Sequence, residues 1–150
     1  TGSPRYASTV AVDMSLGGTI SFNLSLGAIG SGSYYDGPFE SQDSNENVRL
    51  RYSTDNGTSW LDLNVFAINE AGYTMGNRWS LYEYVLDDTH AAATTNTMFQ
   101  LHQAQHSGSY YDTWAIDNFK VVPVPEPISL VMLGCLGAGM AGARKLRRKR

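Results

Sequence analysis

Apolar and polar residues alternate along several short stretches of the first 122 residues. In residues 19–26 (TISFNLSL) every second residue is apolar, and in residues 48–52 (VRLRY) Arg49 and Arg51 stand between apolar positions. A β-strand with one buried and one solvent-facing side requires this period of two. Similar stretches occur at residues 61–66, 79–86, 97–103 and 113–122. The pattern predicts a β-strand over each of these ranges.

Turn-forming residues separate these stretches. Asn56-Gly57 lies between two of them and is the strongest short signal for a β-hairpin. No convincing helix precedes Pro123. Many short strands without helical crossovers predict an all-β fold, an antiparallel two-sheet sandwich. Trp60 and Trp114 fall within strand patterns and are expected in its core.

Length, charge and cysteine content exclude several classes of function for this β domain. The chain has 150 residues, enough for one domain, and we expect it to be truncated because strand-like sequence begins almost at Thr1. Residues 1–122 contain thirteen acidic and five basic residues, a net charge of −8. This acidic body argues against a nucleic-acid partner, whose phosphates require Lys and Arg, and is compatible with cations and neutral sugars. The only cysteine, Cys135, lies outside the body, which excludes cysteine-based chemistry there.

The C-terminal residues form three segments of different composition. Residues 123–127 contain three prolines and predict a stiff, extended linker. Residues 128–143 carry no charge and predict an apolar helix of about 24 Å, short for a hydrocarbon core of about 30 Å. A terminal basic block is retained on the cytoplasmic side of a membrane, so the body is expected outside. That block consists of Arg144, Lys145, Arg147, Arg148, Lys149 and Arg150.

Pro125-Glu126-Pro127, the apolar segment and the basic end occur in the order of the PEP-CTERM sorting signal of Gram-negative bacteria, which the tail resembles. The resemblance implies that an exosortase, a membrane cysteine transpeptidase, recognises the motif and that the rest of the tail is discarded. It also implies an exported protein, transiently in the inner membrane and then at the cell surface or in an exopolysaccharide matrix. The alternative is an ordinary C-terminal anchor with a chance proline linker.

The hexapeptide SGSYYD occurs twice, at residues 31–36 and 107–112. Two loops of similar composition would explain this, because Ser, Gly and Asp are common in loops. Alternatively both copies lie at one end of the sandwich, since four predicted strands separate them, and form a binding rim. The candidate sugar-stacking side chains are Tyr34, Tyr35, Tyr110 and Tyr111.

Residues 36–46 and 112–118 are rich in the carboxylate and amide oxygens that calcium prefers. They lack EF-hand spacing, so they form either a loop-type calcium site or solvated acidic loops. No serine stands in a Gly-x-Ser-x-Gly elbow. Nothing selects a carboxylate pair for glycoside hydrolysis. The sequence therefore predicts a protein that is not an enzyme.

Residues 52–60 (YSTDNGTSW) and 114–118 (WAIDN) are the strongest part of a second likeness, which extends in order over most of residues 5–122. They are similar to the reelin-repeat type of jelly roll. The resemblance implies an extracellular recognition module that often holds one structural calcium. The calcium ligands it implies are Asp117 first, then Asp43, Glu46 and Asp13. The family's cysteine, an arginine at the position of Gln100 and the opening strand are missing, which leaves ligand specificity open.

Together these patterns predict a non-catalytic, exported binding module, with a sandwich at residues 1–122 and a sorting tail at 123–150. The expected ligand is carbohydrate or extracellular matrix. The alternatives are an adhesion domain that binds another protein and an accessory part of a secreted hydrolase.

Overall fold

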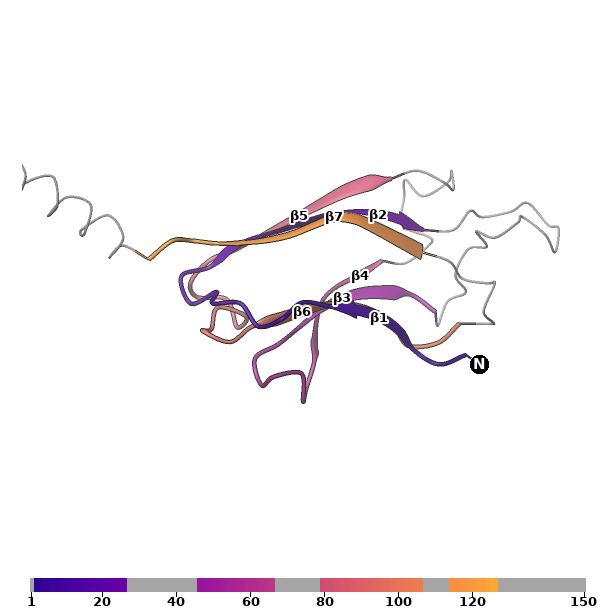
Figure 1. The fold of residues 1–150 in the computed structure, drawn as a ribbon, viewed down its shortest axis with the longest axis horizontal. Helices are drawn as coiled ribbons and strands as arrows, with labels where there is room; N and C mark the ends of the chain where they lie inside the picture. The colour runs from indigo at the N-terminus through magenta and orange to yellow at the C-terminus, as the bar shows by residue number, and fades with distance from the viewer. Residues whose placement is uncertain (1, 27–45, 67–78, 107–113, 127–150) are drawn as a thin grey trace, which may run out of the picture.

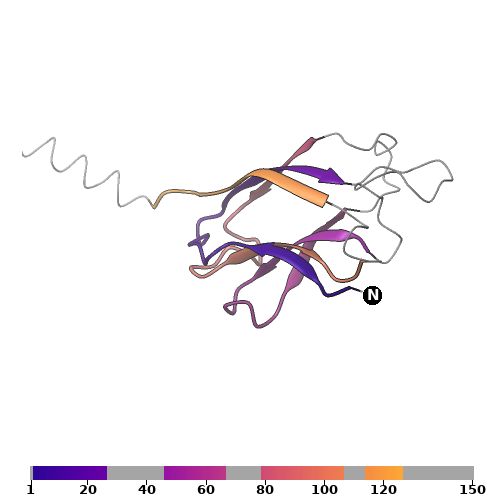
Figure 2. The same ribbon diagram turned by 45° about the vertical axis from the view of Figure 1, so that its right-hand side comes forward.

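A computed structural model describes residues 2–26, 46–66, 79–106 and 114–126 as two β-sheets packed face to face (Figures 1 and 2). The strands are β1 (Arg5–Ser8), β2 (Gly18–Leu26), β3 (Val48–Ser53), β4 (Leu61–Phe66), β5 (Ser80–Leu86), β6 (Met98–Gln103) and β7 (Trp114–Pro123). One sheet has the order β1-β6-β3-β4 and the other β5-β2-β7, with antiparallel pairing throughout. The prediction of an all-β, antiparallel, two-sheet fold is confirmed.

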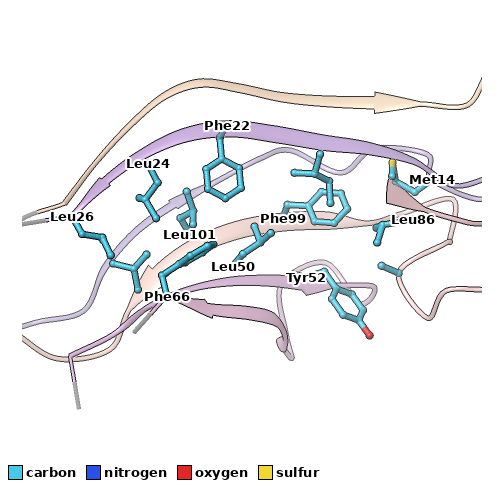
Figure 3. Close-up of a cluster of buried hydrophobic side chains, with 13 residues drawn as sticks. Met14, Phe22, Leu24, Leu26, Leu50, Tyr52, Phe66, Leu86, Phe99 and Leu101 are labelled. Carbon is cyan, nitrogen blue, oxygen red and sulfur yellow. The ribbon is translucent and has the colours of Figure 1, made fainter. Parts of the chain in front are cut away.

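The core lies between the two sheets, where the alternating residues of the strands meet (Figure 3). In β2, Ile20, Phe22 and Leu24 are fully buried, as the period of two predicts. Phe22 is central: its ring lies 5.9 Å from that of Phe66 in the opposite sheet and 5.5 Å from that of Phe119 in β7, centroid to centroid. Aromatic pairs at such separations stabilise a core beyond their buried area.

The β3–β4 hairpin forms at the predicted Asn-Gly pair. Asn56 and Gly57 both have positive φ, 58° and 80°, and the Thr58 amide donates to the Asp55 carbonyl at 3.3 Å. Two consecutive residues with positive φ form a type I′ turn, whose twist matches that of the flanking antiparallel strands. The Ser53 hydroxyl accepts from the Gly57 amide at 2.8 Å and completes the turn.

A β-bulge interrupts the pairing of β7 with β2. Ser21 pairs with Lys120 and Asn23 with Asp117, so two residues of β7 stand opposite Phe22 alone. One of them, Asn118, has a φ of 54°. The bulge changes which residues of β7 face the core: Trp114 and Ile116 before it, then Phe119 and Val121 after it.

The two ends of the sandwich are distinct. Gly18 pairs with Pro123 at one end of the β2–β7 ladder, and Leu26 pairs with Trp114 at the other. Beyond Pro123 the chain continues away from the sheets (Figure 1). The described residues contain no apolar helix with the length needed to span a bilayer. The helix predicted at residues 128–143 lies outside them.

Candidate functional site on the outer face of the four-stranded sheet

The outer face of the β1-β6-β3-β4 sheet carries charged, polar and aromatic side chains from four strands that are distant in sequence. Strand pairing arranges them in rows that cross the sheet. One row contains Ser8, Gln100, Arg51 and Asp62, and the adjacent row contains Tyr6, His102 and Arg49. We call the following residues the outer-face site: Arg49, Arg51, Trp60, Asp62, Gln100 and His102.

The first row is a chain of side-chain hydrogen bonds. The Gln100 amide nitrogen donates to the Ser8 hydroxyl at 2.6 Å, and Arg51 Nε donates to Gln100 Oε1 at 2.6 Å. Gln100 is only 5% exposed although it faces outward. Because both ends of its amide are bonded, Gln100 fixes the position of the arginine beside it.

Trp60 lies at the outer face as well, and not in the core as its strand-like context predicted. It precedes β4 and is half-buried. Its indole nitrogen donates to the Gly57 carbonyl at 3.0 Å, and the Arg51 guanidinium carbon lies 5.1 Å from its ring centroid. The ring therefore supports Arg51 by a cation–π contact. Trp114, the other predicted core tryptophan, does pack against the buried cluster.

Arg49 pairs with a carboxylate on the neighbouring strand: its Nη1 lies 2.5 Å from Asp62 Oδ2. Both side chains are about 40% exposed, so this pair contributes little to stability. With Asp62 counted, the outer-face site contains two arginines and one aspartate, a net charge of +1. The body has only five basic residues, and two of them are here. A local excess of positive charge on an acidic protein favours an anionic ligand.

His102 lies on β6, directly opposite Arg49 of β3. Its Nδ1 is buried and has no hydrogen-bond partner among the described residues. Burial lowers the pKa of His102, and the nearby charges of Arg51 and Arg49 lower it further, whereas Asp62 raises it. The imidazole is therefore neutral at pH 7, able to donate and to accept a hydrogen bond.

A surface depression of about 410 Å³ opens over these side chains. Its volume is within the range of small-ligand sites. It is lined by Arg49, Arg51, Trp60, Leu61, Asp62, His102 and Ala104. Sequence reasoning placed both arginines outward but did not identify the site, because its members meet only through non-local strand pairing.

The described members of the predicted calcium set lie on different elements of the sandwich. Asp13 precedes β2 and accepts hydrogen bonds from the Ser15 amide and hydroxyl, which lower its pKa. Val12, next to Asp13, bridges to Thr97 before β6, whereas the carbonyl of Glu46 accepts from Gln103 at the end of β6. The two carboxylates are thus at opposite ends of that strand.

Asp117 lies on β7 in the three-stranded sheet, opposite Asn23 of β2. Its carboxylate accepts from the amide and the side chain of Asn118, at 2.7 and 3.2 Å, within the β7 bulge. Among the described residues no group of three or more His, Cys, Asp or Glu could hold a metal ion. Asp43 lies outside the described residues, and calcium binding stays a prediction.

Several other predicted site residues lie outside the described part of the chain. They are Tyr34, Tyr35, Tyr110, Tyr111, Pro127 and the basic residues of the terminus. Pro125 and Glu126 are described: both are exposed and follow β7 without regular structure.

Comparison with curated proteins gives no match. The model of the family reelin subrepeat B matches residues 1–122, which is the whole β-sandwich and more than half of the chain. Reelin repeat domains are typically extracellular. The predicted likeness to reelin repeats is thereby confirmed, and the chain belongs to the reelin subrepeat B family.

Proposed function

We propose that the chain is an exported, non-catalytic binding module that a C-terminal PEP-CTERM signal delivers to the cell surface or matrix, where it binds carbohydrate. The observation that carries the binding proposal is the outer-face site, a depression of about 410 Å³ with a supported arginine. Membership of a typically extracellular family is consistent with export.

The sorting proposal rests on the sequence of the tail and on the accessibility of its motif. The last backbone hydrogen bond beyond β7 runs from the Val124 amide to the Gly17 carbonyl, at 3.0 Å. Pro125 and Glu126 follow immediately and are exposed. An extended, accessible segment is what a processing enzyme requires, and the partner of this segment would be a membrane exosortase.

The finer fold proposal is a jelly roll. In an eight-stranded jelly roll, two Greek keys distribute the strands between the sheets. The observed orders, β1-β6-β3-β4 and β5-β2-β7, agree with the second to eighth strands of that fold. The first strand of that fold would lie at the outer edge of β7. This edge is beside an apolar cavity of about 170 Å³. The cavity is lined by Ala7, Ser8, Thr9, Ile116 and Phe119.

The rim of repeated tyrosines remains a second candidate for carbohydrate contact. The four strands expected between the two SGSYYD copies are present as β3, β4, β5 and β6. Leu26 is the last described residue before the first copy, and Trp114 is the first described residue after the second copy; the two are paired in the β2–β7 ladder. This pairing supports the prediction that both copies extend from one end of the sandwich.

Chromatography on immobilised exopolysaccharide tests the proposed function. We expect the chain to be retained and to leave the length of the polymer unchanged. Shortening of the polymer would favour the secreted-hydrolase alternative. Retention by a matrix protein but not by any polysaccharide would favour the adhesion alternative.

A further inference from the structure

Two contacts within the chain hold Arg51 in one arrangement. Its Nε is bonded to Gln100, and its guanidinium lies over Trp60. Its two terminal amino groups have no hydrogen-bond partner among the described residues. Such a pair of donors matches the two oxygens of a carboxylate, and a preorganised guanidinium loses little freedom when it binds one.

The charge of the outer-face site matches one monovalent anion. Arg49 and Arg51 carry two positive charges, Asp62 carries one negative charge, and His102 is neutral at pH 7. One carboxylate neutralises the excess. A phosphate monoester carries more negative charge than the site can compensate. The net charge of −8 on the body repels an acidic polymer elsewhere on the body, so binding of such a polymer by the body has to come from this site.

The depression also has the polarity that a sugar ring requires. Leu61, which is 59% exposed, and Ala104 offer apolar surface for the C–H face of a ring. His102 and Asp62 offer donors and acceptors for its hydroxyls. We propose that the outer-face site binds a carboxylated sugar, a uronic acid within an acidic polysaccharide, with the carboxylate on Arg51. This inference rests on the proposed carbohydrate-binding function and names its ligand class.

Binding to polygalacturonate tests the inference, with the 150-residue chain in a mild detergent because of its apolar tail. Replacing Arg51 by Gln should weaken binding about tenfold or more, because charge-assisted hydrogen bonds are lost. Arg51→Lys keeps the charge and should retain more affinity than Arg51→Gln. Lys120→Gln, the same change of charge on exposed β7 of the other sheet, should bind as the wild type does. Melting temperatures establish that each variant is folded.

A second pair of variants tests the support of Arg51. Trp60→Leu removes the cation–π contact and should weaken binding, whereas Trp60→Phe should recover most of it. If Trp60→Phe binds as weakly as Trp60→Leu, the aromatic support of Arg51 is wrong.

Comparison of polymers separates the inference from the proposed function. Equal binding of neutral dextran, unaffected by Arg51→Gln, would overturn the acidic-sugar assignment and leave the carbohydrate-binding function in place. Tighter, Arg51-dependent binding of dextran sulfate would overturn the carboxylate assignment. Equal binding of polyglutamate would identify an acidic protein as the ligand. Binding of none of the polysaccharides would overturn the proposed function itself.

Discussion

At the scale of single residues, Asp55 organises the β3–β4 turn. Its carboxylate accepts from the Ser59 hydroxyl at 2.5 Å, from the Ser59 amide at 2.9 Å and from the Ser53 hydroxyl at 2.7 Å. These bonds favour the charged form and hold the pKa of Asp55 at about 2, below its usual 3.8, with the Ser59 hydroxyl as the largest cause.

This lowered pKa gives a pH dependence of stability with a definite sign. Unfolding returns the pKa of Asp55 to its usual value, so the folded state gains stability above about pH 4 and loses it as pH falls towards 2. Thermal melting of wild type and Asp55→Asn should show a difference that is present at pH 6 and disappears near pH 2. Asp88→Asn, at an exposed aspartate after β5, is the matched control. A difference that is constant across this range would contradict the prediction.

Residue identity alone does not reveal the outer-face site. The outward positions of Arg49 and Arg51 follow from alternation in one strand, and the hairpin at Asn56-Gly57 follows from local turn chemistry. The contact of Arg51 with Gln100 depends on the pairing of β3 with β6, which are joined by a long stretch of chain. The local pattern of residues along either strand does not report which distant strand it pairs with.

At the scale of elements, the β7 bulge explains why the core-facing positions in the segment WAIDNFKV change from even-numbered to odd-numbered residues. Ile116 faces the core before the bulge and Phe119 after it, because one extra residue is accommodated at Asn118. The sequence therefore predicts the strand, but its Asp-Asn pair does not by itself indicate the bulge. In the structure Asp117 bonds to Asn118 within the bulge.

Replacing Asn118 tests the conformation of the bulge. At a φ of 54°, Ala is less favourable than Gly by about 1 kcal/mol, because only Gly avoids the clash of Cβ with the backbone. We expect Asn118→Ala to lower the free energy of unfolding in urea and Asn118→Gly to lower it less. Equal values for the two variants would mean that the bulge does not require positive φ.

The edge strand β1 shows the limit of prediction from alternation. It has only four residues, and three of them are exposed, so no buried face leaves a periodic signal. Its place is fixed by pairing with β6, from Arg5 opposite Gln103 to Ser8 opposite Gln100. The central strand β2 is buried on one face along its whole length and was therefore predicted with nearly correct bounds.

At the scale of the whole molecule, Phe22 connects the two sheets. Its ring packs against Phe66 of the opposite sheet and against Tyr82 and Phe119 of its own. Phe22→Ala should reduce the free energy of unfolding by about 3–5 kcal/mol, through lost burial and the cavity left behind. Leu81→Ala, at a site 69% exposed in neighbouring β5, should change it by less than about 0.5 kcal/mol. Urea titration measures both, and similar losses would contradict the central role of Phe22.

The two ends of the β2–β7 ladder carry different parts of the chain. The sorting motif begins next to Pro123, at the end of the ladder opposite Leu26 and Trp114. Since Glu126 is exposed and lies beyond the last described backbone hydrogen bond, Glu126→Ala should leave the melting temperature unchanged.

The same substitution should block processing if an exosortase recognises Pro125-Glu126-Pro127. In a host with its exosortase, intact-mass measurement should show that secreted wild-type protein lacks residues 144–150. Val124→Ala, an exposed position just outside the motif, should be processed normally. Glu126→Ala, and the wild type in a strain without the exosortase, should remain uncleaved in the inner membrane. Secreted wild-type protein that keeps its basic end would overturn the sorting proposal, while the sandwich and its outer-face site would be unaffected, because their contacts do not involve the tail.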